Sequence, residues 1–146
     1  MGGSIGAALV RGGVDVLFVD TVQDHVRAMN EVGLKITGPL DEYTVQARAE
    51  EPSEVSGLFP LIFLCVKSQH TVEAVGQLRP HLARDGAVVS VQNGLCELEI
   101  SEALGSGRTV GAFVNFGADY LGPGVVHRGN REPRSWERWT DPSRIG

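Results

Sequence analysis

Two short apolar runs mark the middle of the chain, at residues 61–66 and 87–91. Runs this short and this uniformly apolar are typical of strands buried on both faces, as in a parallel sheet that is covered by helices. Between the runs, apolar residues recur at the spacing of a helix face, at Val72, Val75, Leu78 and Leu82. The pattern predicts a strand, a crossover helix and a second strand, and therefore an α/β fold built on a parallel sheet.

Polar residues follow each of these apolar runs directly. The first run is followed by a Lys-Ser-Gln sequence that begins at Lys67, and the second by a Gln-Asn-Gly sequence centred on Asn93. Parallel strands end at one edge of a sheet, and ligands of open α/β sheets bind at that edge, so we expect Lys67 and Asn93 to face one site. Each motif alone also fits a plainer interpretation, a solvated lysine at a strand end and a tight Asn-Gly turn.

The chain opens with a glycine cluster, MGGSIGAALV, that runs into a helix of small residues. Dinucleotide-binding folds place G-x-G-x-x-G after a buried strand, because the backbone must approach the pyrophosphate at a helix N-terminus. Gly3 and Gly6 fit the second and third glycines, with Ser4 and Ile5 between them. Met1 stands where the first glycine belongs, and no strand precedes it. We expect residues 3–6 to hold a pyrophosphate; a flexible glycine-rich terminus is the alternative.

An acidic residue at the end of the next predicted strand supports a dinucleotide site. Residues 15–19 form an apolar run that ends at Asp20, which lies 17 residues beyond Gly3. In dinucleotide-binding folds an acid about 20 residues after the glycine turn accepts the hydroxyls of the adenosine ribose. Asp20 also suits the N-cap of a predicted helix over residues 22–32, a role that is compatible with the first.

The remaining segments predict further elements of the same fold. Short alternating segments at residues 34–37 and 43–47 indicate a hairpin insertion. Beyond them we expect a helix over residues 97–104 and a strand over 109–114, followed by a Phe-Gly-Ala segment and a Gly-Pro-Gly turn. The predicted fold class is α/β: a Rossmann-like parallel sheet with flanking helices and a hairpin insertion, lacking its first strand. An open edge is expected there, prone to aggregation.

Composition limits the class of protein. The chain has 146 residues, of which 42% are hydrophobic, and a net charge of −5, which suits one globular domain and offers no basic surface for nucleic acid. No apolar run approaches the roughly 20 residues that span a bilayer, and no signal peptide is recognisable, so we expect a cytoplasmic protein without a membrane partner. Cys65 and Cys96 form no C-x-x-C pair, so we expect both to be reduced, and the scattered histidines indicate no metal site.

These motifs together resemble the N-terminal, nucleotide-binding half of the ketopantoate reductase (2-dehydropantoate 2-reductase) family, over about residues 2–130. The most specific parts are the Val-Lys-Ser motif around Lys67 and the Gln-Asn-Gly-Leu motif around Asn93. The glycine turn is shared with many dehydrogenases. Gln-Asn-Gly-Leu together with Phe-Gly-Ala and Gly-Pro-Gly-Val-Val favours this family over glycerol-phosphate or opine dehydrogenases, which have a similar N-terminal half.

The resemblance implies that a 2-keto acid, 2-dehydropantoate, is reduced to a 2-hydroxy acid by hydride from NADPH, in pantothenate biosynthesis. By the same resemblance residues 3–6 hold the pyrophosphate, Lys67 reaches the nicotinamide end, Asn93 fixes the nicotinamide ribose and the substrate, and Ala118 lines the cofactor. At the position where a basic residue usually meets the 2′-phosphate of NADPH, this chain has Asp20. An acid repels that phosphate, so NADH is an alternative cofactor, and Arg27 is the only basic candidate nearby.

The family's catalytic lysine and its carboxylate partner belong to a C-terminal helical domain that this sequence does not contain. We therefore assign no catalytic residue. A non-catalytic, truncated dinucleotide-binding fragment is the alternative to a reductase, and a homodimer would cover the open edge of the sheet.

The last residues of the sequence differ in character from the rest. We expect a nucleotide-binding domain over residues 1–131 and a tail over 132–146, which is polar and carries Trp136 and Trp139 out of any amphipathic register. Such a tail is typical of a disordered terminus. A shift of reading frame near Arg131 is a second hypothesis, because one back-translation in the shifted frame gives an apolar strand.

Overall fold

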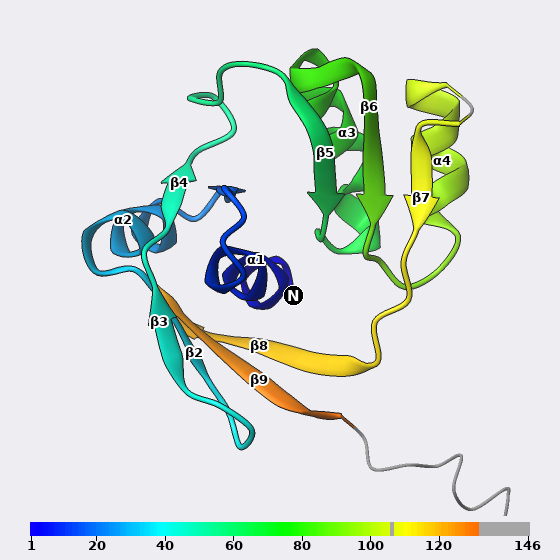
Figure 1. The fold of residues 1–146 in the computed structure, drawn as a ribbon. Helices are drawn as coiled ribbons and strands as arrows, with labels where there is room; N and C mark the ends of the chain where they lie inside the picture. The colour runs from blue at the N-terminus through cyan, green and yellow to red at the C-terminus, as the bar shows by residue number, and fades with distance from the viewer. Residues whose placement is uncertain (106, 132–146) are drawn as a thin grey trace, which may run out of the picture.

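A computed structural model describes residues 1–105 and 107–131 of the chain (Figure 1). It contains the helices α1 (Gly2–Arg11), α2 (Gln23–Val32), α3 (Thr71–Leu78) and α4 (Cys96–Leu104). Its strands are β1 (Leu17–Val19), β2 (Leu34–Thr37), β3 (Tyr43–Val45), β4 (Arg48–Glu50), β5 (Phe59–Leu64), β6 (Leu82–Ser90), β7 (Thr109–Gly111), β8 (Phe116–Gly122) and β9 (Val125–Arg131). Two 3-10 turns, Ser68–His70 and Arg79–His81, flank α3. No helix of the described residues has both the length and the hydrophobicity needed to cross a bilayer.

The predicted strand, crossover helix and strand are confirmed as β5, α3 and β6. β5 pairs with β6 and β6 with β7, both in parallel, and α3 and α4 pack on these strands (Figure 1). Their shared core includes Leu64, Val75, Val88 and Ile100. β6 begins at Leu82, five residues earlier than the apolar run, because Leu82 already pairs with Phe59 beyond an irregularity in the register. The carboxyl ends of β5, β6 and β7 therefore meet at one edge.

A second parallel pair lies apart from these three strands. β1 pairs with β4 and, within the described residues, with no other strand, and β5 likewise has only β6 as a partner. α1 lies between β4 and β5 in Figure 1. The wholly parallel strands thus form two separate sheets, β1-β4 and β5-β6-β7, and Leu61 and Phe63 of β5 are 50% and 39% exposed. The α/β class with flanking helices is confirmed, but the parallel strands do not join into one continuous sheet.

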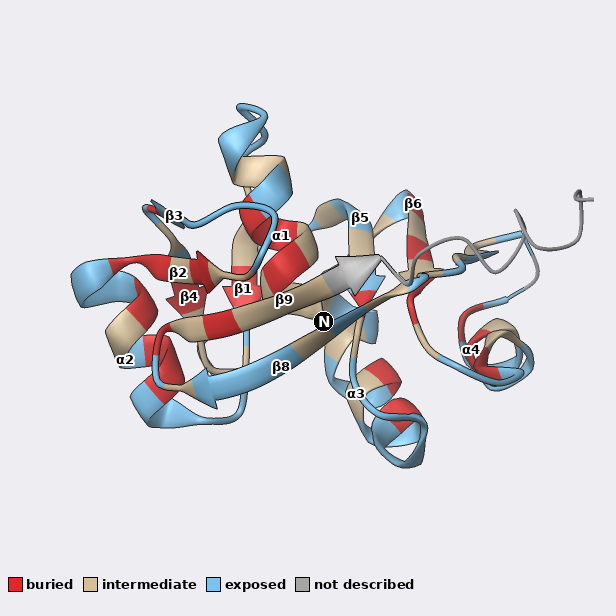
Figure 2. Ribbon diagram, turned by 90° about the horizontal axis from the view of Figure 1, so that it is seen from below, coloured by how far each residue is buried: buried red, intermediate tan, exposed pale blue. Residues whose placement is uncertain are grey.

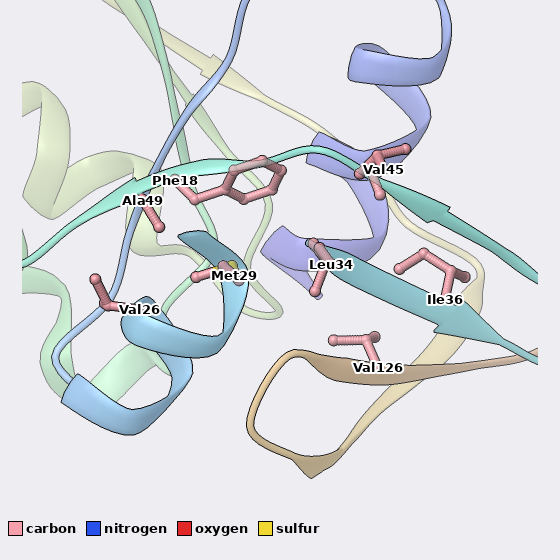
Figure 3. Packing of buried hydrophobic residues seen from close by; sticks show 9 residues of the cluster. Phe18, Val26, Met29, Leu34, Ile36, Val45, Ala49 and Val126 are labelled. Carbon is pink, nitrogen blue, oxygen red and sulfur yellow. The ribbon is translucent and has the colours of Figure 1, made fainter. Parts of the chain in front are cut away.

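The predicted hairpin insertion is confirmed as β2 and β3, which pair antiparallel. The sequence did not predict that β9 pairs in parallel with β2, and that β8 then adds to β9, giving the order β3-β2-β9-β8. Figure 2 shows α1 against this sheet, and Figure 3 shows the core between the sheet, α1 and α2. Its buried members include Ala7, Phe18, Met29, Leu34 and Val126.

The strand β4 was not predicted, because two of its three residues, Arg48 and Glu50, are charged. In the structure only Ala49 is buried. Its place is set by a side chain of α2. Asn30 donates from Nδ2 to the Ala49 carbonyl at 2.8 Å and accepts from the Ala49 amide at Oδ1 at 2.9 Å. This paired contact mimics a neighbouring strand and holds β4 beside β1.

A buried histidine joins α2 to the turn between β8 and β9. His25 is only 6% exposed, and its Nδ1 accepts the Gly124 amide at 2.9 Å, which requires an unprotonated Nδ1. Tyr120 meets the imidazole edge to face, with 5.1 Å between ring centroids. Burial lowers the pKa of His25, although the charge of Asp20 acts in the opposite direction. The folded protein therefore holds this ring neutral.

Acidification is expected to destabilise the protein through His25. A lowered pKa means that the unfolded chain binds the proton more readily, so this contribution to stability is complete above the unfolded pKa of about 6.5 and is lost as the pH falls below it. His25→Gln keeps an acceptor for the Gly124 amide but does not titrate. Urea unfolding at pH 7.5, 6.5 and 5.5 should show the wild type losing stability relative to this variant, by at most about 1.4 kcal/mol per pH unit. Parallel pH profiles would contradict the role of His25.

Candidate functional site

The first turn of α1 is suited to bind an anion. The helix begins at Gly2, and the amides of Ser4 and Ile5 both donate to the Met1 carbonyl, at 3.0 and 3.2 Å. The amides of Gly2 and Gly3 have no acceptor within the described residues, and the turn carries no acidic side chain. Unpaired amides and the helix dipole give this end a partial positive charge, which favours a phosphate group.

The glycines of α1 let the helix pack closely against three neighbours. A Cβ on Gly2 would lie 3.2 Å from Cys65 Cβ, and one on Gly3 would lie 3.2 Å from Val126 Cγ2. At Gly6 the contact is closest, because a Cβ would lie 2.3 Å from Cε1 of Phe18 in β1. Close packing of helix on strand is the role of the third glycine in dinucleotide-binding motifs. Gly6 thus packs α1 on β1 as the third glycine of such a motif would, and its role toward a cofactor stays a prediction.

A hollow of about 390 Å³ lies where α1 begins and the strands β5, β6 and β7 end. It is lined by Met1 and by residues that follow each strand, namely 65–69, 91–93 and 112–114, together with Phe116. The two residues that the sequence placed at one site, Lys67 and Asn93, both line it. This hollow occupies the edge at which open α/β sheets bind their ligands.

Lys67 and Asn93 are both exposed, and no ion pair or side-chain hydrogen bond of either is found within residues 1–105 and 107–131. Lys67 precedes the 3-10 turn, where its carbonyl accepts the His70 amide at 2.8 Å. Gly94, directly after Asn93, has a φ of +102°, which favours glycine. The ammonium and the amide are therefore both available to a ligand in the hollow.

An apolar wall of the hollow was missed by the sequence analysis. The run at residues 109–114 was predicted to be one strand, but β7 ends at Gly111 because its partner β6 ends at Ser90. The last contact is the Ala112 amide, which donates to the Ser90 carbonyl at 2.9 Å. The following residues leave the sheet and line the hollow, and Phe113 is 90% exposed. The Ala-Phe-Val sequence is apolar in either case, so it does not show whether these residues continue the strand or line a binding site.

Asp20 lies at the end of β1, outside the residues that line the hollow. Its Oδ1 accepts the Val22 amide at 2.9 Å, in the turn that leads into α2. Because α2 begins at Gln23, the N-cap residue is Val22 and not Asp20. The second carboxylate oxygen remains available. Arg27, the basic residue closest in sequence, pairs with Asp24 at 3.0 Å on the exposed face of α2.

Comparison with known proteins identifies the family of this chain. The sequence model described as "Ketopantoate reductase PanE/ApbA" matches residues 1–136. The chain belongs to this family. It is 35% identical over 127 residues to a 2-dehydropantoate 2-reductase of Pyrococcus abyssi, covering 86% of this chain and 40% of that protein. The resemblance found in the sequence motifs is thereby confirmed, in preference to the glycerol-phosphate and opine dehydrogenases.

Solved structures show the same fold. A PanE/ApbA family ketopantoate reductase from Ralstonia eutropha is 31% identical, with a TM-score of 0.70, over 84% of this chain and 41% of that one. A D-mandelate dehydrogenase solved with NADH and anilino(oxo)acetate is 24% identical, with a TM-score of 0.81, over 88% of this chain and 42% of that one. At that identity the likeness concerns the fold alone. The chain spans about 40% of the length of the relatives that it matches.

Besides Asp20, five of the predicted cofactor residues lie outside the lining of the hollow, namely Gly3, Ser4, Ile5, Gly6 and Ala118. Ala118 pairs with Arg128 across β8 and β9 and packs against the core of α1 and α2, whereas Phe116, two residues earlier, lines the hollow. Ser4 is 2% exposed, and its hydroxyl has no hydrogen-bond partner within the described residues. Ile5 is half-buried beside it. Their roles toward a ketopantoate reductase cofactor stay predictions.

The two cysteines are free, as the sequence predicted. Burial raises the pKa of the Cys65 thiol to about 11, so the thiol remains protonated at neutral pH. Within the described residues no three His, Cys, Asp or Glu side chains gather as metal ligands would. The predicted change of frame near Arg131 concerns residues beyond the described part, and the family match extends to residue 136.

Proposed function

We propose that this chain binds a nicotinamide dinucleotide, and that the ketopantoate reductase to which it corresponds uses the bound cofactor to reduce 2-dehydropantoate, a 2-keto acid, to a 2-hydroxy acid. The observation that carries the proposal is the hollow in which Lys67 and Asn93 meet the start of α1. A cation, an amide and a helix N-terminus at one sheet edge match the phosphates and the nicotinamide riboside of such a cofactor.

The residues in the hollow and at the start of α1 beside it fit the cofactor. The unpaired amides of Gly2 and Gly3 would hold the pyrophosphate, for which residues 3–6 were predicted. Asn93 would bind the nicotinamide ribose, and Phe113 would offer an apolar surface to the ring. Lys67 would reach the nicotinamide end of the cofactor, and its charge would also attract the carboxylate of the keto acid. The cofactor, when bound, supplies the hydride, while the protein contributes binding and orientation.

Cofactor binding without turnover is the second candidate function for this chain by itself. The chain spans 40% of the length of the Pyrococcus abyssi relative. Reduction of a keto acid is then proposed for an assembly that also contains the remaining part of such a relative. A homodimer stays a prediction.

Titration of the purified chain with NADH and with NADPH, followed by nicotinamide fluorescence, tests the proposal. The sequence contains two lysines, Lys67 in the hollow and Lys35 in β2, where Lys35 pairs with Glu42 at 2.8 Å. Lys67→Ala is expected to weaken binding about fivefold to tenfold, which corresponds to the loss of one charged contact, and Lys35→Ala to leave it unchanged. Absence of binding by a folded wild-type sample would refute the proposed function.

A further inference from the structure

Gln92 connects the two loops that carry Lys67 and Asn93. Its Nε2 donates to the Val66 carbonyl at 2.9 Å and to the Thr71 hydroxyl at 2.8 Å. Both acceptors lie outside its own loop, Val66 after β5 and Thr71 at the start of α3. Because a carbonyl only accepts, the side-chain NH2 group must face Val66, which fixes the orientation of the amide. Gln92 itself stands directly before Asn93, so one side chain joins the two neighbouring strand ends.

Thr71 passes this connection on to the other side of Lys67. The Thr71 hydroxyl, which accepts from Gln92, donates to the Ser68 carbonyl at 2.8 Å. The carbonyls on either side of Lys67, at positions 66 and 68, are thus both held, one by Gln92 directly and one through Thr71. Thr71 is only 1% exposed, so its hydroxyl has little access to water as an alternative partner.

Ser90, the last residue of β6, also contacts this network. It is fully buried at the end of β6, and its hydroxyl lies 3.5 Å from Gln92 Oε1, a weak contact that completes the polar environment of the amide. Lys67 and Asn93, by contrast, are exposed, and no side-chain hydrogen bond joins them in the described structure. Their relative position therefore depends on the backbone that Gln92 and Thr71 hold.

We propose that Gln92 is a positioning residue, which through Thr71 holds Lys67 and Asn93 in the arrangement that receives the nicotinamide end of the cofactor. The inference rests on the proposed function. It predicts a selective loss, since the adenosine end is assigned to α1 and Asp20, which Gln92 does not touch. Contacts to NADH should weaken when the network is broken, whereas contacts to ADP, which lacks the nicotinamide half, should not.

The test compares NADH and ADP binding in variants of the whole chain. Gln92→Met keeps the length of the side chain but removes its hydrogen bonds, and is expected to weaken NADH binding about fivefold to tenfold, the effect of losing two such bonds. The fluorescence enhancement of bound NADH should fall as well. ADP affinity should stay within twofold of the wild type. Gln77→Met, at an exposed glutamine of α3 without a side-chain hydrogen bond in the described structure, is the matched control and should change neither.

A second pair of variants separates positioning from general stability. Thr71→Val removes the hydroxyl and should reproduce the selective loss of NADH affinity, while Thr71→Ser retains the hydroxyl and should restore it. Equal NADH affinity in Gln92→Met and the wild type would overturn the inference, and so would a parallel loss of NADH and ADP affinity. If wild-type protein binds neither ligand, the proposed function fails, which is a different result from the failure of Gln92 alone.

Discussion

Replacing Gly6 by Ala is expected to lower the free energy of unfolding by about 1–3 kcal/mol, the usual cost of overpacking a core. The added Cβ would lie 2.3 Å from Cε1 and 2.8 Å from Cζ of Phe18, which is 8% exposed and packed in the core of α1 and α2. Either the ring or the helix must move. Because movement of α1 displaces the amides of Gly2 and Gly3, which we propose to bind the pyrophosphate, cofactor affinity should fall with stability. Urea unfolding and NADH titration of the same variant measure both effects.

Gly76 provides a matched control for this substitution. It lies inside α3, and a Cβ there would have nothing within 4 Å. Gly76→Ala should therefore stabilise the protein by about 0.5–1 kcal/mol, because alanine has the higher helix propensity and lowers the conformational entropy of the unfolded chain. Phe18→Leu removes the ring edge that causes the clash. In the Gly6→Ala background it should cost less stability than in the wild type. Additive effects of the two substitutions would show that the clash with Phe18 is not what lowers the stability of Gly6→Ala.

The second large effect is expected at Asp20, which should make the wild type bind NADH more tightly than NADPH. A carboxylate a few ångströms from a 2′-phosphate costs on the order of 1–2 kcal/mol at a solvated surface, which is about tenfold in affinity. Asp20→Asn removes the charge but keeps the Oδ1 that accepts the Val22 amide. We therefore expect this variant to gain about tenfold in NADPH affinity without a change in stability.

Comparison of Asp20→Ala with Asp20→Asn separates the effect of the charge from that of the hydrogen bond in the turn. Asp20→Ala removes the carboxylate and also the hydrogen bond to Val22, so it should relax the cofactor preference and lower stability together. Arg27 is a second control, because its partner is Asp24 and its loss should leave the preference unchanged. Tighter binding of NADPH than NADH by the wild type would show that Asp20 does not face the adenosine ribose.

The elements with a strong hydrophobic pattern were predictable from the sequence. β5, α3 and β6 follow the two apolar runs and the helical spacing between them. The meeting of Lys67 and Asn93 followed as well, because parallel strands end at one edge. These predictions use local patterns and a topological rule, and neither depends on distant side chains.

The parts that could not be predicted depend on contacts between distant segments. β4 has a polar sequence and is held by Asn30 of α2, 19 residues away. The pairing of β9 with β2 brings together residues about 90 positions apart in the sequence, such as Lys35 and Val125. The Gln92 network likewise spans 21 to 26 positions, to Thr71 and Val66. A local pattern carries no information on such partners.

The central claim is that the start of α1 and the ends of β5 and β6 form one cofactor site. It is tested most directly by following the backbone amide resonances of the labelled chain during titration with NADH. The account predicts that the amides of Gly3, Lys67 and Asn93 shift together, with one common saturation curve, while Thr44 in β3 does not move. Saturable binding that leaves these three amides unchanged, or that moves only one of the segments, would contradict it.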